Sequence, residues 1–343
     1  MVDGKAMGNS TADKWTPDVL GHGFEKLDLP LDDDDEGPVQ ATLVRFRPTA
    51  RAAAPKPGPT PNTVLYVHGW NDYFLHTELA QFWAELDVAC YAVDLRKHGR
   101  SLGKHQTPGF ITSLDDYDPD LEAAIAALVE DQQELHGAEV NPRIHLMGHS
   151  TGGLVASLWA DRNPGRICSL ILNSPWLELH GSSLVRNATS SLVEPLARIR
   201  PQARLKLPEI GFYWRTLSNQ ADGEWELNDE WRWEFGFPIR AGWLRAVMAG
   251  QTQVASGLNV DVPVMVLLSD RSLASPVWND DAMRSDIVVD VKQIARRAPR
   301  LGRRVTINRV EGAIHDVLLS SKPVRTTAYA DLKQWAQAYV LSG

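Results

Sequence analysis

Short apolar runs alternate along this chain with stretches whose apolar residues recur at helical spacing. Runs that are apolar at nearly every position are typical of strands buried on both faces of a sheet. Alternating strands and helices of this kind favour an α/β fold with a mostly parallel, doubly wound sheet. The runs are Thr63–Val67, Ala89–Val93, Ile144–Met147, Leu170–Asn173 and Val264–Leu268, and Val305–Val310 is a further strand-like segment. The predicted helices are Glu78–Leu86, Leu121–Leu135, Gly153–Asp161, Val291–Arg297 and Thr326–Val340.

Two more extended segments precede these runs. Residues 23–29 and 40–46 flank the acidic run Asp32–Glu36 and indicate a β-hairpin at one edge of the sheet. Neighbouring like charges repel one another, so we interpret the acidic run as a solvated turn. We therefore expect an eight-stranded sheet.

One long stretch interrupts the alternation. No strand pattern is evident from His180 to Asn259, and this stretch holds five of the chain's twelve tryptophans. An insertion between two strands lies beside the carboxyl ends of the sheet, where ligands bind in folds of this class. We expect residues 1–179 and 260–343 to form the core domain, and residues 180–259 to form a helical lid with one or two tryptophans in an acyl pocket. The alternative is a structural subdomain whose tryptophans fill a small core.

A serine stands between two glycines at the end of one predicted strand. The pentapeptide Gly148–Gly152, with Ser150 at its centre, follows the run Ile144–Met147 and precedes a helical pattern. Glycines lack a Cβ, so the backbone can fold tightly around the serine and lift its hydroxyl clear of the sheet. The helix that follows points its unpaired N–H groups at the same place. The pattern therefore predicts a nucleophile elbow with Ser150 as the nucleophile.

A serine nucleophile needs a base and an acid that orients the base. His315 follows a strand-like run late in the chain, as the order serine, acid, histidine requires. Two residues compete to be the acid. Asp286 precedes the apolar pair Val288 and Val289, which would pin it beside an imidazole, whereas Asp270 directly follows a buried run. We favour Asp286 and keep Asp270 as the alternative.

The oxyanion of the reaction needs backbone N–H groups that are aimed before the reaction begins, each contributing about 3 kcal/mol. Thr151, directly after the nucleophile, supplies one of them. The second should come from the glycine turn after the first buried run, where we assign the N–H of Trp70 and keep Asn71 as the alternative. We assign packing or hydrogen-bonding roles to His68 and His149, which lie in these turns.

The bulk composition excludes several classes of partner. The formal net charge is −8, and no basic cluster is denser than the pairs Arg296–Arg297 and Arg303–Arg304, so nucleic acid is not expected as a partner.

Cys90 and Cys168 lie in apolar runs, which predicts buried thiols with no disulfide and no metal site. Residues 1–7 lack the apolar segment of a secretory signal, and no stretch is long and apolar enough to span a membrane. We expect a cytoplasmic protein without a cofactor, and leave its oligomeric state open.

Together these motifs resemble those of the α/β-hydrolase superfamily, and within it the monoacylglycerol lipase and lysophospholipase-like serine hydrolases. The resemblance implies an α/β-hydrolase fold, a triad of Ser150, Asp286 and His315, and a lid formed by the inserted segment. The stretch Asp270–Ser285 is longer than this family usually shows, which keeps Asp270 open as an acid. The matching pieces, which span nearly the whole chain in the family's order, are His68–Trp70, Asp94–Ser101, Gly148–Gly153, Asp286 with Val289–Asp290, and His315.

The function that we expect is hydrolysis of carboxylic esters without a cofactor, through an acyl-enzyme on Ser150. Suitable substrates are monoacylglycerols, lysophospholipids or similar small acyl esters. The same triad supports amide, thioester or C–C bond hydrolysis, which is an alternative within the enzyme class. A non-catalytic ligand-binding protein on this fold is the alternative from a different class.

Overall fold

The computed structural model describes residues 14–48, 60–179, 193–206 and 211–342, and the expectation for residues 1–7 lies outside them. Its centre is a nine-stranded sheet in the order β1-β2-β3-β5-β4-β6-β7-β8-β9. The pairs from β1 to β5 along this order are antiparallel, and those from β5 to β9 are parallel. The strands are β1 Thr16–Pro17, β2 Phe24–Asp34, β3 Gly37–Phe46, β4 Asn62–Val67, β5 Ala89–Asp94, β6 Arg143–His149, β7 Ser169–Asn173, β8 Val264–Ser269 and β9 Val305–Val310.

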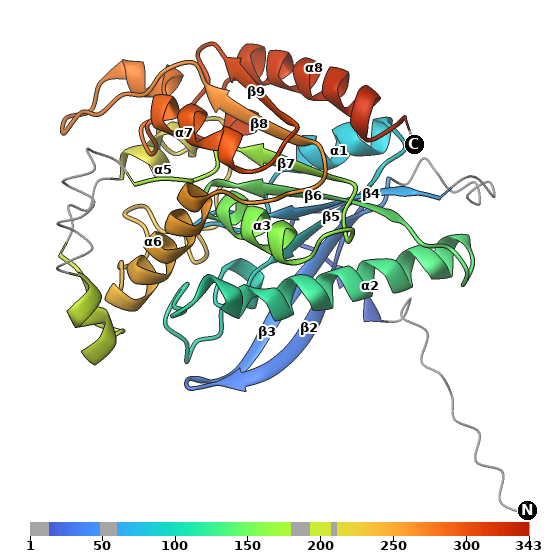
Figure 1. Cartoon of the computed structure of the whole chain (residues 1–343), viewed down its shortest axis with the longest axis horizontal. Coiled ribbons are helices and arrows are strands. Elements are labelled where there is room, and N and C mark those ends of the chain that lie inside the picture. The colour runs from blue at the N-terminus through green and yellow to red at the C-terminus, as the bar shows by residue number, and fades with distance from the viewer. Residues whose placement is uncertain (1–13, 49–59, 180–192, 207–210, 343) are drawn as a thin grey trace, which may run out of the picture.

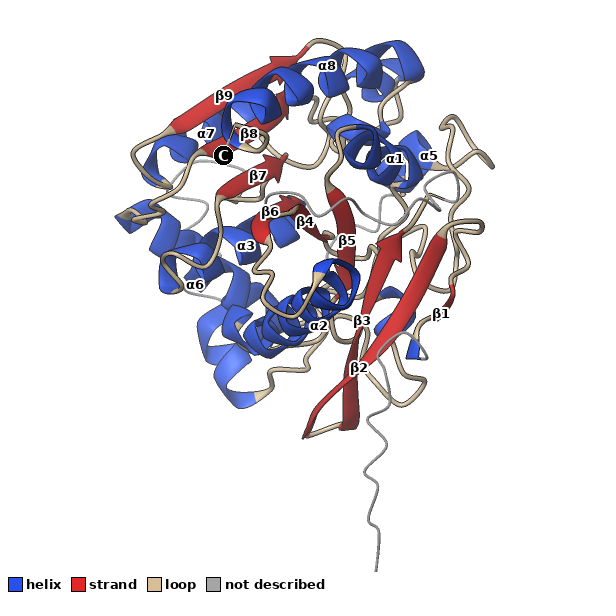
Figure 2. Ribbon diagram, turned by 90° about the vertical axis from the view of Figure 1, so that its right-hand side faces the viewer, coloured by secondary structure: helices blue, strands red, loops and turns tan. Residues whose placement is uncertain are grey.

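The number of strands corrects our prediction of eight. The additional strand is β1, which consists of Thr16 and Pro17 and pairs with Lys26 and Glu25 of β2. Two residues are too few to produce an alternation of apolar and polar positions, so the sequence pattern could not reveal this strand. Figure 2 shows the long β2–β3 hairpin with β1 at one end of the sheet and β8 and β9 at the other.

Helices cover both faces of the sheet, and this explains the continuous apolar runs. On β4, Leu65 and Val67 belong to the apolar cluster shared with α2 and α3, while Val64 and Tyr66 belong to the cluster shared with α1 and α8. Figure 1 shows these two pairs of helices on opposite sides of the sheet. A strand in this position has no exposed face, so its sequence does not alternate. The helices are α1 Thr77–Glu85, α2 Asp118–His136, α3 Ser150–Arg162, α5 Phe212–Leu217, α6 Ala241–Ser256, α7 Val291–Arg297 and α8 Lys322–Tyr339.

The acidic run differs from our interpretation of it as a solvated turn. The ammonium nitrogen Nζ of Lys97 lies 2.6 Å from Asp34 Oδ2 and 2.7 Å from Glu36 Oε2, and the Lys97 side chain is 3% exposed. Asp32, Asp33 and Asp35 are exposed, as a solvated turn requires, and the interpretation is wrong only for Asp34 and Glu36, which are half-buried and pair with Lys97. Their cation comes from the loop after β5, so the acidic run itself carries no sign of it.

The last helix of the insertion belongs to the main core. In the insertion, residues 193–199, α5 and α6 are helical, and residues 180–192 and 207–210 lie outside the described residues. Trp243 and Val247 of α6 are buried in the same apolar cluster as Leu158 of α3. Gly250 permits this close approach, because a Cβ there would lie 2.9 Å from Leu158 Cδ1. Figure 1 shows α6 beside α3, near the carboxyl ends of the parallel strands.

Candidate active site

Ser150 lies at the junction of β6 and α3, in a strained turn. Its φ of 50° is in the left-handed region, which residues other than glycine rarely adopt. The glycines on either side are required by close contacts. A Cβ on Gly152 would lie 2.1 Å from the carbonyl oxygen of His68, and a Cβ on Gly148 would lie 2.6 Å from the carbonyl oxygen of Gly152. The turn therefore holds the serine hydroxyl at the carboxyl end of the parallel sheet.

The structure brings His315 between Ser150 and Asp286. His315 Nε2 lies 3.0 Å from Ser150 Oγ, and His315 Nδ1 lies 2.9 Å from Asp286 Oδ2. The other carboxylate oxygen of Asp286 accepts hydrogen bonds from the backbone N–H groups of Val288 and Val289, both at 2.8 Å. The two valines thus fix the carboxylate as expected, but through their backbone rather than through their apolar side chains.

Asp286 reaches this position because the preceding loop closes on itself. The backbone N–H of Asp286 donates to the carbonyl oxygen of Arg271 at 3.0 Å, and that of Leu273 donates to Asp286 O at 2.9 Å. The chain thereby returns to the end of β8 after the long stretch seen in the sequence. Asp270 instead accepts a hydrogen bond from Gly312 N–H at 3.0 Å. No hydrogen bond joins it to His315 in the part of the chain that the structure describes.

The turn after β4 lies directly beside the serine. A Cβ on Gly69 would lie 3.1 Å from Ser150 Cβ, so the backbone that carries Trp70 passes against the nucleophile. Neither Trp70 N–H nor Thr151 N–H has a hydrogen-bond acceptor among the described residues. The Asn71 side chain exchanges two hydrogen bonds with the backbone of Trp233 in the insertion, at 2.9 and 3.0 Å. Trp70 N–H in this turn and Thr151 N–H at the start of α3 are therefore unengaged, as donors that are to bind an oxyanion would be.

Aromatic rings line one side of this turn. The Trp70 ring lies against Trp243 of α6, with ring centroids 3.7 Å apart and an interplanar angle of 34°, and Trp176 lies 5.9 Å from Trp243. The backbone N–H of Trp176 also donates to the carbonyl oxygen of Ser150, at 2.9 Å. One of the five tryptophans of the insertion, Trp243, therefore packs between two tryptophans of the core, and at 1% exposed it is part of the packed interior.

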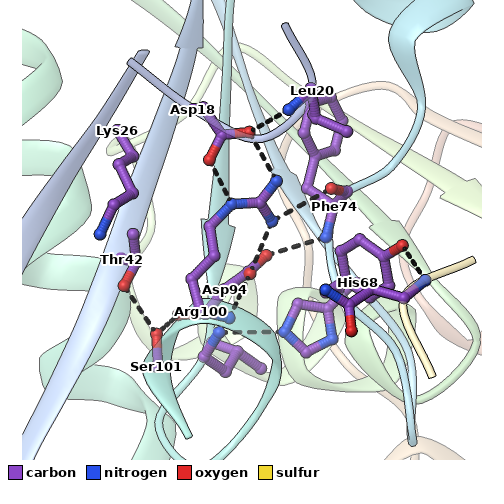
Figure 3. Close-up of polar contacts among 12 residues, drawn as sticks. Asp18, Leu20, Lys26, Thr42, His68, Phe74, Asp94, Arg100 and Ser101 are labelled. Carbon is purple, nitrogen blue, oxygen red and sulfur yellow. Dashed lines mark hydrogen bonds and ion pairs between the residues drawn. The ribbon is translucent and has the colours of Figure 1, made fainter. Parts of the chain in front are cut away.

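The motif Asp94–Ser101 supports the loop that continues from this turn. Asp94 accepts hydrogen bonds from the backbone N–H of Phe74 at 2.8 Å and from Arg100 Nη1 at 2.8 Å. Figure 3 shows the Arg100 guanidinium held between Asp94 and Asp18, with Asp18 bonded to Nε at 2.6 Å and Nη2 at 2.8 Å. His68 accepts from the backbone N–H of Leu95 at 3.0 Å, which is the hydrogen-bonding role expected of it. A buried ion cluster thus fixes the loop around the predicted oxyanion donors.

Replacing Arg100 by methionine is expected to lower the free energy of unfolding by about 3–5 kcal/mol, because Asp18 and Asp94 would remain buried without a cation. The Asp18 and Asp94 side chains are 1% and 0% exposed. Urea unfolding followed by circular dichroism measures the change. Arg198→Met is the matched control, since Arg198 is 70% exposed in its pair with Glu194 and should contribute under about 1 kcal/mol. Equal unfolding midpoints for the two variants would contradict the assignment.

A second set of buried polar side chains surrounds His315, and the sequence did not predict it. Asp316, next to the base, accepts hydrogen bonds from Asn173 Nδ2 at 2.6 Å and contacts His76 Nε2 at 2.8 Å. Three further members of the set are Tyr213 and Arg232 from the insertion and Asp72 from the loop after β4. His149, which we expected in a packing or hydrogen-bonding role, makes a hydrogen bond with Tyr213. These residues are far apart in the sequence and follow no spacing, so only the fold brings them together.

The described ranges hold no group of three or more His, Cys, Asp and Glu side chains arranged to bind a metal ion. None of the helices in them combines the length and the apolarity that a membrane span needs. Cys90 and Cys168 are both free thiols; Cys90 is buried as predicted, whereas Cys168 is half-buried.

Comparison with known proteins identifies relatives of this chain. The model of a family described as serine aminopeptidase, S33, matches residues 58–321. The monoacylglycerol lipase of Mycolicibacterium smegmatis is 29% identical over 145 residues, which are 40% of this chain and 48% of that protein. The human monoglyceride lipase is 30% identical over 122 residues, which are 35% of this chain and 37% of that protein. The chain thus spans about half the length of the first relative and 37% of the length of the second.

A solved structure extends the likeness to nearly the whole chain. The structure of a soluble variant of monoglyceride lipase from Saccharomyces cerevisiae, in complex with a substrate analog, has a TM-score of 0.57 and 14% sequence identity. The likeness covers 95% of this chain and 94% of that one. At this identity the comparison shows the fold alone, and it confirms the predicted α/β-hydrolase fold.

Proposed function

The chain belongs to the serine aminopeptidase S33 family, and we propose that within it the protein is a serine hydrolase of carboxylic esters. One observation carries this proposal. Ser150 Oγ lies 3.0 Å from His315 Nε2, and His315 Nδ1 lies 2.9 Å from Asp286 Oδ2. A hydroxyl, an imidazole and a carboxylate in this order form the arrangement that activates a serine for acyl transfer.

Each residue has one role in the proposed reaction. His315 Nε2 takes the proton of Ser150 Oγ as the hydroxyl attacks the ester carbonyl, and returns it to the leaving alcohol. Asp286 accepts the Nδ1–H hydrogen bond, which fixes the tautomer and stabilises the charged imidazole. The N–H groups of Trp70 and Thr151 donate to the oxyanion. Water then attacks the acyl-enzyme with His315 as the base.

The proposed substrates are small acyl esters such as monoacylglycerols and lysophospholipids. Two relatives are named as monoacylglycerol or monoglyceride lipases, and the half-buried Trp70 and Trp176, whose backbones lie beside Ser150, suit an acyl chain. We propose that residues 180–259 cover the site as a lid on a core of residues 1–179 and 260–343. The net charge of −8 opposes binding to nucleic acid, and two free thiols suit the reducing cytoplasm.

Labelling with a fluorophosphonate tests the proposal, since this reagent reacts with an activated serine. We expect one adduct per chain, located at Ser150, and hydrolysis of p-nitrophenyl esters with a rate that depends on acyl length. A ligand-binding protein on this fold would remain unlabelled. The family description makes amides the second class to test, so aminoacyl p-nitroanilides belong in the same assay. Faster turnover of the anilides than of the esters would make the protein a peptidase.

A further inference from the structure

Tyr213, in α5 of the insertion, packs against the imidazole of His315. The two rings meet edge to face, with centroids 5.1 Å apart and an interplanar angle of 78°. The ring of His149 lies 4.9 Å from the same imidazole. His315 is itself 1% exposed. The proposed base is therefore enclosed by two rings, in addition to its contacts with Ser150 and Asp286.

The direction of the hydrogen bond between Tyr213 and His149 follows from the other contacts of His149. His149 Nδ1 lies 3.0 Å from the carbonyl oxygen of Asn173, which can only accept, so Nδ1 carries a proton. Burial lowers the pKa of His149 to about 4, so its ring is neutral near pH 7 and Nε2 has no proton. The Tyr213 hydroxyl, 3.2 Å from Nε2, is therefore the donor.

A buried ion pair fixes Tyr213 from its other side. Arg232 Nη1 donates to Asp72 Oδ1 at 2.5 Å, and the two side chains are 2% and 1% exposed. The Arg232 guanidinium carbon also lies 5.0 Å from the centre of the Tyr213 ring, within the range of a cation–π contact. Asp72 lies just after the turn that carries Trp70. The ion pair between Asp72 and Arg232 therefore joins the insertion to the core beside the site.

We infer that Tyr213 is a positioning residue that holds the His315 imidazole in line with Ser150. His149 holds its hydroxyl and Arg232 packs on its ring, so the ring limits the rotation of the imidazole during proton transfer. A displacement of about 1 Å in such a group can cost about 10²-fold in rate. The inference rests on the proposed function of Ser150, and it makes the insertion part of the reaction geometry as well as a cover.

Two substitutions separate the ring of Tyr213 from its hydroxyl. Tyr213→Ala removes both and should lower kcat/KM for a p-nitrophenyl ester by about 10²-fold, mostly through kcat. Tyr213→Phe keeps the packing and loses one hydrogen bond, so we expect a loss of roughly fivefold. Phe212→Ala is the matched control on the same helix. Its ring contacts Trp278, 5.6 Å away, and its loss should change kcat/KM by less than about twofold.

Comparing two esters with different leaving groups gives a ratio of kcat/KM values that a loss of protein stability alone would not change. Nitrophenolate leaves without a proton, whereas an alkyl alkoxide needs one from His315. The Tyr213→Ala variant should therefore lose several times more kcat/KM on an ethyl ester than on the p-nitrophenyl ester of the same acid. An equal loss on the two esters would overturn the inference, as would an unchanged or increased kcat.

The controls separate this inference from the proposed function. If the wild-type chain were neither labelled by fluorophosphonate nor active on esters, both would fail. If the wild type were active and Ser150→Ala inactive, while Tyr213→Ala kept full kcat, only the inference would fail. Thermal unfolding of each variant shows whether it is folded. If Tyr213→Ala does not fold, Tyr213→Phe decides, since a lower kcat at an unchanged Tm supports the inference and an unchanged kcat overturns it.

Discussion

Replacing Ser150 by alanine is expected to lower ester turnover on the order of 10⁶-fold, the effect of removing the nucleophile of a serine hydrolase. Alanine keeps the Cβ, so it fits the turn at φ 50° as well as serine does, and the fold should be unchanged. Initial rates on p-nitrophenyl butyrate measure the loss, and circular dichroism checks the fold. The residual activity should equal that of buffer plus the small contribution of the oxyanion donors.

The matched control for this variant is Ser157→Ala on the same helix. Ser157 Oγ donates to the carbonyl oxygen of Gly153 at 2.7 Å and makes no contact with His315. Its removal should change turnover by less than about threefold. If Ser150→Ala kept more than about a tenth of the wild-type rate, the nucleophile would have to be another group.

Replacing Asp286 by asparagine is expected to lower kcat about 10⁴-fold, because an amide in this place favours the wrong tautomer of the imidazole. The carboxylate now accepts from His315 Nδ1 and from two backbone N–H groups. The asparagine side chain can keep the two backbone bonds through its oxygen, so the loop should stay folded. Measuring kcat on a p-nitrophenyl ester, together with Tm, tests the expectation.

Asp270→Asn is the variant to measure beside it. Among the described residues, the Asp270 side chain accepts one hydrogen bond, from Gly312 N–H, and an asparagine oxygen can accept the same bond. We expect a loss of less than about tenfold in kcat. A larger loss at Asp270 than at Asp286 would reverse the assignment of the acid.

Much of the fold follows from the local pattern of the sequence. The parallel strands β4 to β8 are buried on both faces, so each appears as a mostly apolar run, whereas the edge strand β9 is only partly buried and mixes polar with apolar residues. The apolar residues of the helices between them recur at helical spacing. The nucleophile follows from local chemistry too, since a Cβ on Gly148 would meet the carbonyl oxygen of Gly152 in the same turn. Features of this kind are determined by residues within one turn or strand, and the sequence displays those residues side by side.

Other features depend on how distant segments fold back, and there the sequence left alternatives open. The choice between Asp286 and Asp270 depends on a loop that pairs Ser272 with Asp286, which no spacing reveals. No spacing reveals the contact of Lys97 with the acidic run either. The contacts that lead from Asp72 through Arg232 to Tyr213 also could not be predicted, because the path of the insertion over the sheet determines them.

The burial of α6 limits how a substrate can enter. Swinging the whole insertion outwards on a hinge would expose Trp243 and Val247, which are 1% and 0% exposed, and each such side chain would cost about 1.5–3 kcal/mol. We therefore expect α6 to stay docked when a substrate enters. Any movement that admits an ester has to leave Trp243 and Val247 packed against the core.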